Sequence, residues 1–228
     1  MDLSKLEKLI QYEFKNKELL KEALTHRSYL NENPRWHAPN NERLEFLGDA
    51  VLELATTEAL FGKFPNEDEG KLTTYRAALV NYQMLAKLSA EIKLGDFLLM
   101  SKGEAKDQGR AREVILANAM EALIGALYLD GGYQETQRFI SRIVLPALED
   151  VLSKKLYRDP KSLLQEKSQA EYKSTPIYKL LGESGPDHKK VFVVGVFIRD
   201  EKVAEGKGMS KQDAEVEAAR KALEIVEE

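Results

Sequence analysis

Apolar residues recur at every third or fourth position over residues 3–147, which is the period of an amphipathic helix. The clearest runs lie in residues 3–10, 19–24 and 44–54. Three polar stretches interrupt the pattern and predict loops, namely residues 31–41, 64–71 and 101–112. This part of the chain therefore predicts a compact domain built from helices.

The pattern changes at Pro160, after a charged segment. Helices are predicted for residues 162–172 and 210–226, and strands for residues 177–183, 190–199 and 202–208. The second strand, "KVFVVGVFIR", is rich in β-branched and aromatic residues, as expected for a buried strand. The chain therefore predicts an all-α domain over residues 1–152, a linker over 153–160, and a small α+β domain of order αβββα over 161–228.

Composition places the chain among folded proteins without disulfides. Of its 228 residues, 43% are hydrophobic and 32% charged, so it can bury a real core. The absence of cysteine excludes disulfides and thiolate zinc sites. The N-terminal segment "MDLSKLEKLIQYEF" has neither the apolar core of a signal peptide nor a long run able to span a bilayer, so we expect a cytoplasmic protein with no membrane partner. The net charge of −4 does not indicate nucleic-acid binding, which must follow from where individual residues lie.

Two apolar helices carry unexpected polar residues. In "NERLEFLGDAVLELA" (41–55), Glu42, Glu45 and Asp49 fall at about 0°, 300° and 340° around the helix axis, so they share one stripe. In "VILANAMEALIGALYL" (114–129) the one formal charge is Glu121, and Asn118 lies three positions earlier on the same face.

If these two helices pack face to face, four oxygen-bearing side chains converge: Glu45, Asp49, Asn118 and Glu121. Burying carboxylates without a partner costs several kcal/mol, so a cation is expected among them. All four are hard oxygen ligands, and the three histidines are scattered, so Mg²⁺ is favoured over zinc, with Mn²⁺ as a substitute. Such an ion activates water and stabilises charge on a phosphate.

A simpler interpretation remains open. Each acid can instead be a solvated or salt-bridged helix residue, with Arg43 or Arg76 as its partner. Other kinds of catalytic site have less support, because the chain lacks a Gly-x-Ser-x-Gly elbow and a glycine-rich phosphate loop. We therefore expect no nucleotide cofactor.

Several stretches together resemble the bacterial ribonuclease III family. They are "NERLEFLGDAVLEL", "ALTHRSYLNE", "EGKLTTYRAALVN", "LGDFLLMSKGE" and "ILANAMEALIGALYLDGGY", and the C-terminal part resembles a double-stranded-RNA-binding domain. The resemblance covers nearly the whole chain. It implies a homodimeric, metal-dependent endoribonuclease that processes double-stranded RNA. The implied products have 5′-phosphate and 3′-hydroxyl ends with short 3′ overhangs.

The resemblance also assigns roles to residues of the first domain. Glu45, Asp49 and Glu121 resemble metal-binding catalytic carboxylates, and the position of Asn118 belongs to the same set. Glu42 and Glu69 resemble accessory acids near the cleft. Phe46 resembles the residue that contacts the partner subunit, although core packing is an alternative that the sequence leaves open.

Asn118 departs from the family pattern, in which this position is usually aspartate. Asparagine still offers a carbonyl oxygen, but it is neutral, so the site loses one negative charge and some metal affinity. The chain is therefore either an active enzyme with a neutral ligand or a catalytically weakened or inactive protein that still binds double-stranded RNA. A third possibility is a helical scaffold whose acids form salt bridges.

The second domain offers residues that suit duplex RNA, which exposes 2′-hydroxyls and phosphates more than base edges. Gln165 and Glu166 are predicted to reach 2′-hydroxyls, and His188 resembles a second minor-groove contact. Lys211 lies at the start of the last helix, where amide groups favour phosphate, and Lys207 lies nearby. The alternative for each is a solvated polar residue without a specific role.

Overall fold

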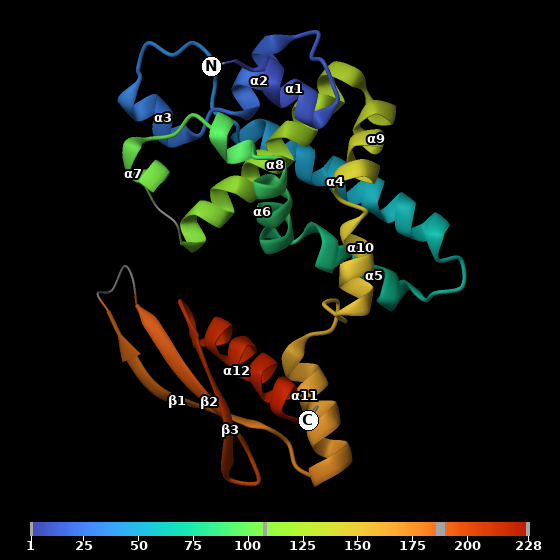
Figure 1. The fold of residues 1–228 in the computed structure, drawn as a ribbon, viewed down its shortest axis with the longest axis vertical. Coiled ribbons are helices and arrows are strands. Elements are labelled where there is room, and N and C mark those ends of the chain that lie inside the picture. Colours follow the sequence, from blue (N-terminus) through green and yellow to red (C-terminus); the bar gives the residue numbers. More distant parts are fainter. Residues whose placement is uncertain (1, 107–108, 186–189, 227–228) are drawn as a thin grey trace. The chain divides into compact units, whose positions relative to one another are not determined.

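The computed structural model describes the chain except for residues 1, 107–108, 186–189 and 227–228 (Figure 1). Its contacts divide the chain into two compact units, Met1–Tyr157 and Arg158–Glu228, which we call the helical unit and the sheet unit. The predicted fold class, an all-α domain followed by a small αβββα domain, is confirmed. The division falls inside the stretch 153–160.

The helical unit contains no β-strand among its described residues, apart from a single bridge between Thr25 and Leu99. Its elements in chain order are α1 (Ser4–Ile10), α2 (Lys17–Ala23), α3 (Arg27–Glu32), α4 (Glu42–Lys63), α5 (Glu69–Val80), α6 (Tyr82–Glu91), the 3₁₀ helix η1 (Leu94–Phe97), α7 (Lys102–Lys106), α8 (Arg110–Gly131), α9 (Tyr133–Ile143) and α10 (Ala147–Ser153).

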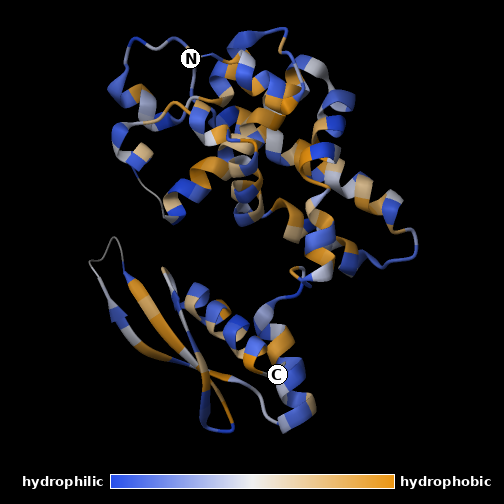
Figure 2. Cartoon of the chain, viewed as in Figure 1, coloured by the Kyte–Doolittle hydropathy of each residue, from blue (hydrophilic) through white to orange (hydrophobic). Residues whose placement is uncertain are grey.

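Helix α8 is the centre of the helical unit. Its middle is buried on nearly all sides, with Ala119, Met120, Leu123 and Ile124 fully inaccessible to solvent. Figure 2 shows apolar residues of the other helices gathered around it. By length and composition alone α8 is apolar enough to cross a membrane. Its apolar surface is instead covered by other helices, as expected for a core helix.

All three predicted loops are partly helical, and the stretch 31–41 begins with the last two residues of α3. Helix α5 begins inside the stretch 64–71, because the Asp68 side chain accepts a hydrogen bond from the Lys71 amide at 2.8 Å and caps the helix. The stretch 101–112 contains α7 and the first residues of α8. Polar and glycine-containing sequence thus marks helix ends here as well as loops.

The sheet unit has two helices on one face of a three-stranded antiparallel sheet of order β1-β2-β3 (Figure 1). Its elements are α11 (Pro160–Tyr172), β1 (Ile177–Ser184), β2 (Val191–Ile198), β3 (Glu201–Gly208) and α12 (Lys211–Val226). Helix α12 lies close on β3, since a Cβ on Gly206 would overlap the backbone of Ala214 and Ala218. This contact completes a small core that also contains Leu164 and Val196.

Candidate functional site

The predicted site depends on the crossing of α4 and α8, where each helix carries a glycine. A Cβ on Gly48 would overlap the carbonyl oxygen of Glu121 and lie 2.9 Å from the amide nitrogen of Gly125. A Cβ on Gly125 would overlap the carbonyl oxygen of Leu44. Only the missing side chains let two helix backbones approach this closely. The crossing therefore fixes which residues of the two helices face each other.

Four predicted site residues come together at this crossing, and we call them the acidic cluster: Glu45, Asp49, Asn118 and Glu121. The Asn118 side chain lies beside that of Glu45 and lowers the pKa of its carboxyl group. The charges of Asp49 and Glu45 both raise the pKa of the Glu121 carboxyl group. Asp49 is exposed and the other three are partly buried, so the cluster lies at the protein surface and not within the core.

The acidic cluster carries uncompensated negative charge. Burial, together with the charges of Asp49 and Glu45, raises the pKa of Glu121 to about 7. Burial and the neighbouring charge of Glu42 also raise the pKa of Glu45, while the polar side chain of Asn118 acts in the opposite direction. Among the described residues, no lysine or arginine forms an ion pair with these three carboxylates.

The basic residues considered as partners lie elsewhere. The Arg76 guanidinium pairs with Glu53, with 2.7 Å between Nε and Oε2, and also donates to the Thr57 hydroxyl. Arg43 acts electrostatically on Glu22. The salt-bridge interpretation of the acidic cluster therefore lacks the partners that it requires.

The side-chain chemistry of the acidic cluster suits a hard divalent cation. Carboxylate and amide oxygens are preferred ligands of Mg²⁺ and Mn²⁺, and a cation would offset the repulsion that raises the pKa of Glu121. The described residues nevertheless contain no three acidic or histidine side chains close enough together to hold an ion as they stand. The structure thus shows a set of mutually repelling oxygen ligands and not a closed coordination shell.

The two accessory acids lie in different places. Glu42 begins α4 and acts electrostatically on Glu45, and its Oε1 lies 3.3 Å from Nη1 of Arg27, an ion pair that the sequence did not indicate. Glu69 begins α5 and lines a recess with Thr57 and Phe61, near the other end of α4. Those residues lie two to three helical turns beyond Asp49, so within one chain Glu69 is not part of the acidic cluster.

Phe46 projects from α4 into solvent. Its side chain is 82% exposed, which excludes core packing within a single chain. Leu54 and Phe61 are also exposed, at 58% and 73%, and their spacing continues the same side of the helix. Exposed apolar residues in a row of this kind indicate a surface that another protein covers.

The predicted RNA-binding residues of the sheet unit are exposed. Gln165 and Glu166 lie on α11, where Glu166 pairs with Arg158. Lys207 lies on β3 and Lys211 is the first residue of α12. His188 lies outside the described residues, so its prediction is not addressed by the structure.

Comparison with known proteins accounts for both units. Residues 16–148 match the Ribonuclease-III-like family, and residues 160–226 match the double-stranded RNA binding motif. The chain is 46% identical over 224 residues to Ribonuclease 3 of Nitratiruptor sp., covering 98% of this chain and 96% of that protein. This chain belongs to the ribonuclease III family.

Other members of the ribonuclease III family give the same result. Ribonuclease 3 of Campylobacter fetus is 45% identical over 222 residues, which cover 97% of each protein. The solved nuclease domain of ribonuclease III from Campylobacter jejuni is 45% identical, with a TM-score of 0.58. The match covers 64% of this chain and 97% of the solved one. The work on that nuclease domain concerns structural flexibility in a region involved in dimer formation.

Proposed function

We propose that this member of the ribonuclease III family is an endoribonuclease that hydrolyses the phosphodiester bonds of double-stranded RNA with the help of Mg²⁺. The products are expected to have 5′-phosphate and 3′-hydroxyl ends with short 3′ overhangs. The observation that carries the proposal is the acidic cluster at the α4–α8 crossing, whose carboxylates have no basic partner among the described residues. The double-stranded RNA binding motif at residues 160–226 of the same chain indicates the substrate.

We assign the metal ligands to Glu45, Asp49 and Glu121, with the side-chain oxygen of Asn118 as a neutral fourth. A bound divalent cation activates water and stabilises charge on the scissile phosphate. The contribution of the protein is to hold the ligands in place. The α4–α8 crossing fixes the backbones, and it places the Asn118 amide beside the Glu45 carboxylate. Glu121 must lose its proton before it can bind a cation.

We also propose that the enzyme works as a homodimer that is joined through Phe46 and the exposed row of α4. This proposal is supported by the exposure of Phe46 and by the dimer-forming region of the Campylobacter jejuni nuclease domain. A symmetric dimer presents two acidic clusters, so that each can cut one strand of a duplex.

In the sheet unit we assign duplex RNA binding to Gln165, Glu166, Lys207 and Lys211, together with His188. The exposed position of Lys211 at the start of the 16-residue helix α12 favours a phosphate contact, because amide groups point outward at that end. Gln165 and Glu166 lie on the exposed side of α11, where 2′-hydroxyls are suitable partners.

One cleavage assay tests the proposed function. A long RNA duplex is incubated with Mg²⁺ and the wild type, Asn118→Asp, Glu121→Gln or the control Glu149→Gln, which changes an exposed acid of α10. We expect cleavage by all except Glu121→Gln. Cleavage by Asn118→Asp alone would instead support the inactive RNA-binding protein. Cleavage by Glu121→Gln at the wild-type rate would contradict the assignment of the acidic cluster.

A further inference from the structure

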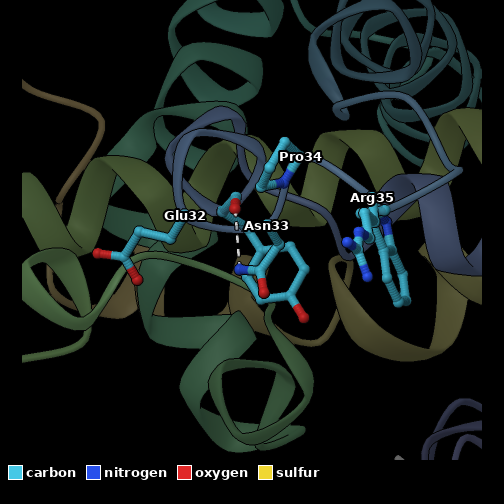
Figure 3. A pocket seen from close by; sticks show the side chains of 6 residues that line it. Glu32, Asn33, Pro34 and Arg35 are labelled. Carbon is cyan, nitrogen blue, oxygen red and sulfur yellow. Dashed lines mark hydrogen bonds between the residues drawn. The ribbon is translucent and has the colours of Figure 1, made fainter.

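A recess outside the acidic cluster lies at the end of α3 and in the loop that follows it. It has a volume of about 400 Å³, and we call it the α3 recess. Figure 3 shows its labelled side chains, with Asn33 between Glu32 and Arg35. The six lining residues are Tyr29, Glu32, Asn33, Pro34, Arg35 and Trp36.

The aromatic walls of the α3 recess are held in place before any ligand arrives. The Trp36 indole N–H donates a hydrogen bond to the Thr25 hydroxyl at 3.2 Å. The ring of Tyr29 meets that of Trp36 edge-on, with 5.5 Å between ring centroids. The Asn33 amide donates to the carbonyl oxygen of Tyr29 at 3.0 Å. A recess ordered in this way loses little conformational entropy when it binds a flat ligand.

The polar groups of the α3 recess include groups that the protein does not use. Arg35 is exposed and forms no ion pair with any described residue. Glu32 accepts a hydrogen bond from the Lys102 amide through one oxygen, Oε2, at 3.3 Å, which leaves its other oxygen for a ligand. Aromatic rings, an arginine plane, and donors and acceptors at the rim are the groups that bind unpaired nucleobases.

The position of the α3 recess relates it to the proposed RNA substrate. Helix α3 begins at Arg27, which pairs with Glu42 beside the acidic cluster, and ends at Glu32 in the recess. Six helical residues span about 9 Å, so the Arg27–Glu42 pair and the recess lie at the two ends of one short helix. An RNA strand that runs from the acidic cluster along α3 would meet the recess.

We propose that the α3 recess binds an unpaired nucleobase of the RNA substrate, next to the duplex segment that is cut. The bases of an intact duplex are stacked and paired, so they do not enter the recess. RNA with an unpaired nucleotide beside the cleavage position then gains a contact that a perfect duplex lacks. This inference rests on the proposed function, because it needs RNA at the acidic cluster.

The test uses Trp36, which is the single tryptophan of the chain. Two short duplexes, one perfectly paired and one with a single unpaired nucleotide, are titrated into the full-length protein in EDTA while tryptophan fluorescence is measured. Trp36 lies in the helical unit, so its fluorescence reports on RNA bound there. We expect quenching by the duplex with the unpaired nucleotide and little change with the perfect one. Because stacking of a base strengthens binding by about fivefold or more, we expect tighter binding of the same duplex.

Arg35→Ala keeps Trp36 and removes the guanidinium, so it should reduce the quenching and abolish the difference in affinity. Arg138→Ala is the matched control, because Arg138 is exposed on α9 and already paired with Glu135. Equal quenching of the wild type by the two duplexes, or an unchanged difference in Arg35→Ala, would overturn the inference. Cleavage of the perfect duplex by the wild type with Mg²⁺ is measured separately, so failure of the proposed function is seen independently.

Discussion

Gly48 of α4 and Glu121 of α8 meet backbone to backbone, because a Cβ on Gly48 would overlap the carbonyl oxygen of Glu121. The same residue, Glu121, supplies the carboxylate whose pKa is raised to about 7. The contact that brings the two helices close together therefore also places the Glu121 carboxylate beside Asp49 and Glu45. Each of the following predictions tests a part of this arrangement or of the surfaces around it.

Gly48→Ala should destabilise the protein and reduce cleavage, because a methyl group must push α4 away from α8. Overpacking typically costs about 1–3 kcal/mol, and a clash with backbone atoms lies at the upper end of this range or above it. Thermal unfolding and duplex cleavage measure the two effects.

Gly62→Ala is the matched control on the same helix. Outside the helix's own neighbouring backbone, no described atom lies within 4 Å of a Cβ at position 62, so this change should be neutral or stabilise the helix by about 0.5–1 kcal/mol. Equal effects of the two substitutions would show that the close approach at Gly48 is not required.

The stability of the metal-free protein should fall as pH rises from about 4.5 to about 7. Burial and the charges of Asp49 and Glu45 raise the pKa of Glu121 from its ordinary value of 4.5 to about 7, so in this interval the folded state binds more protons than the unfolded state. The free energy of unfolding therefore decreases as pH rises across this window. Above about pH 7 the ionisation of Glu121 no longer changes it. Glu121→Gln should remove the effect and stabilise the metal-free protein at pH 8 by about 1 kcal/mol, allowing for solvent screening.

Thermal unfolding in EDTA as a function of pH measures this dependence. Added Mg²⁺ should stabilise the wild type at pH 8 and have little effect on Glu121→Gln, because a bound ligand stabilises the state that binds it. A pH dependence that is unchanged in Glu121→Gln would locate the titrating group elsewhere.

Phe46→Ala should weaken the dimer while the fold of each chain is kept. The side chain is 82% exposed in the single chain, so its truncation leaves no cavity in the core. Buried aromatic anchors at interfaces typically contribute about 2 kcal/mol or more to binding. The dissociation constant of the dimer should therefore rise at least about 30-fold. Sedimentation over a range of concentrations measures the change. Leu9→Ala, at an exposed leucine of α1, should leave the association constant unaltered.

Lys211→Ala should weaken RNA binding by a similar factor for every duplex sequence. Loss of one phosphate contact should lower the slope of log affinity against log salt concentration by about 1. The comparison is Lys202→Ala, since Lys202 is paired with Glu205 at 3.1 Å and is not assigned to RNA. An undiminished salt slope in Lys211→Ala would mean that this lysine does not contact phosphate.

Local sequence patterns were sufficient for the element types and for the polar residues that stand out. Spacing alone placed Glu45 and Asp49 on one stripe of a helix, and the single charge in residues 114–129 singled out Glu121. Helix capping was harder to predict. The sequence predicted a loop over residues 64–71, but the hydrogen bond from the Lys71 amide to the Asp68 side chain caps α5, which begins at Glu69. The period of hydrophobic residues reports which face is buried but not where a helix begins.

Two domains, their fold classes, and a set of oxygen-bearing side chains that suit a divalent cation could be predicted from the sequence. Which of those residues meet depends on tertiary packing. The glycines at 48 and 125 bring Glu45 and Asp49 to Asn118 and Glu121, whereas Glu69 lies near the far end of α4. Tertiary packing also decided that Phe46 is exposed and that α3 forms a recess. Contacts between distant segments depend on how whole helices pack, and periodicity within one helix does not contain that information.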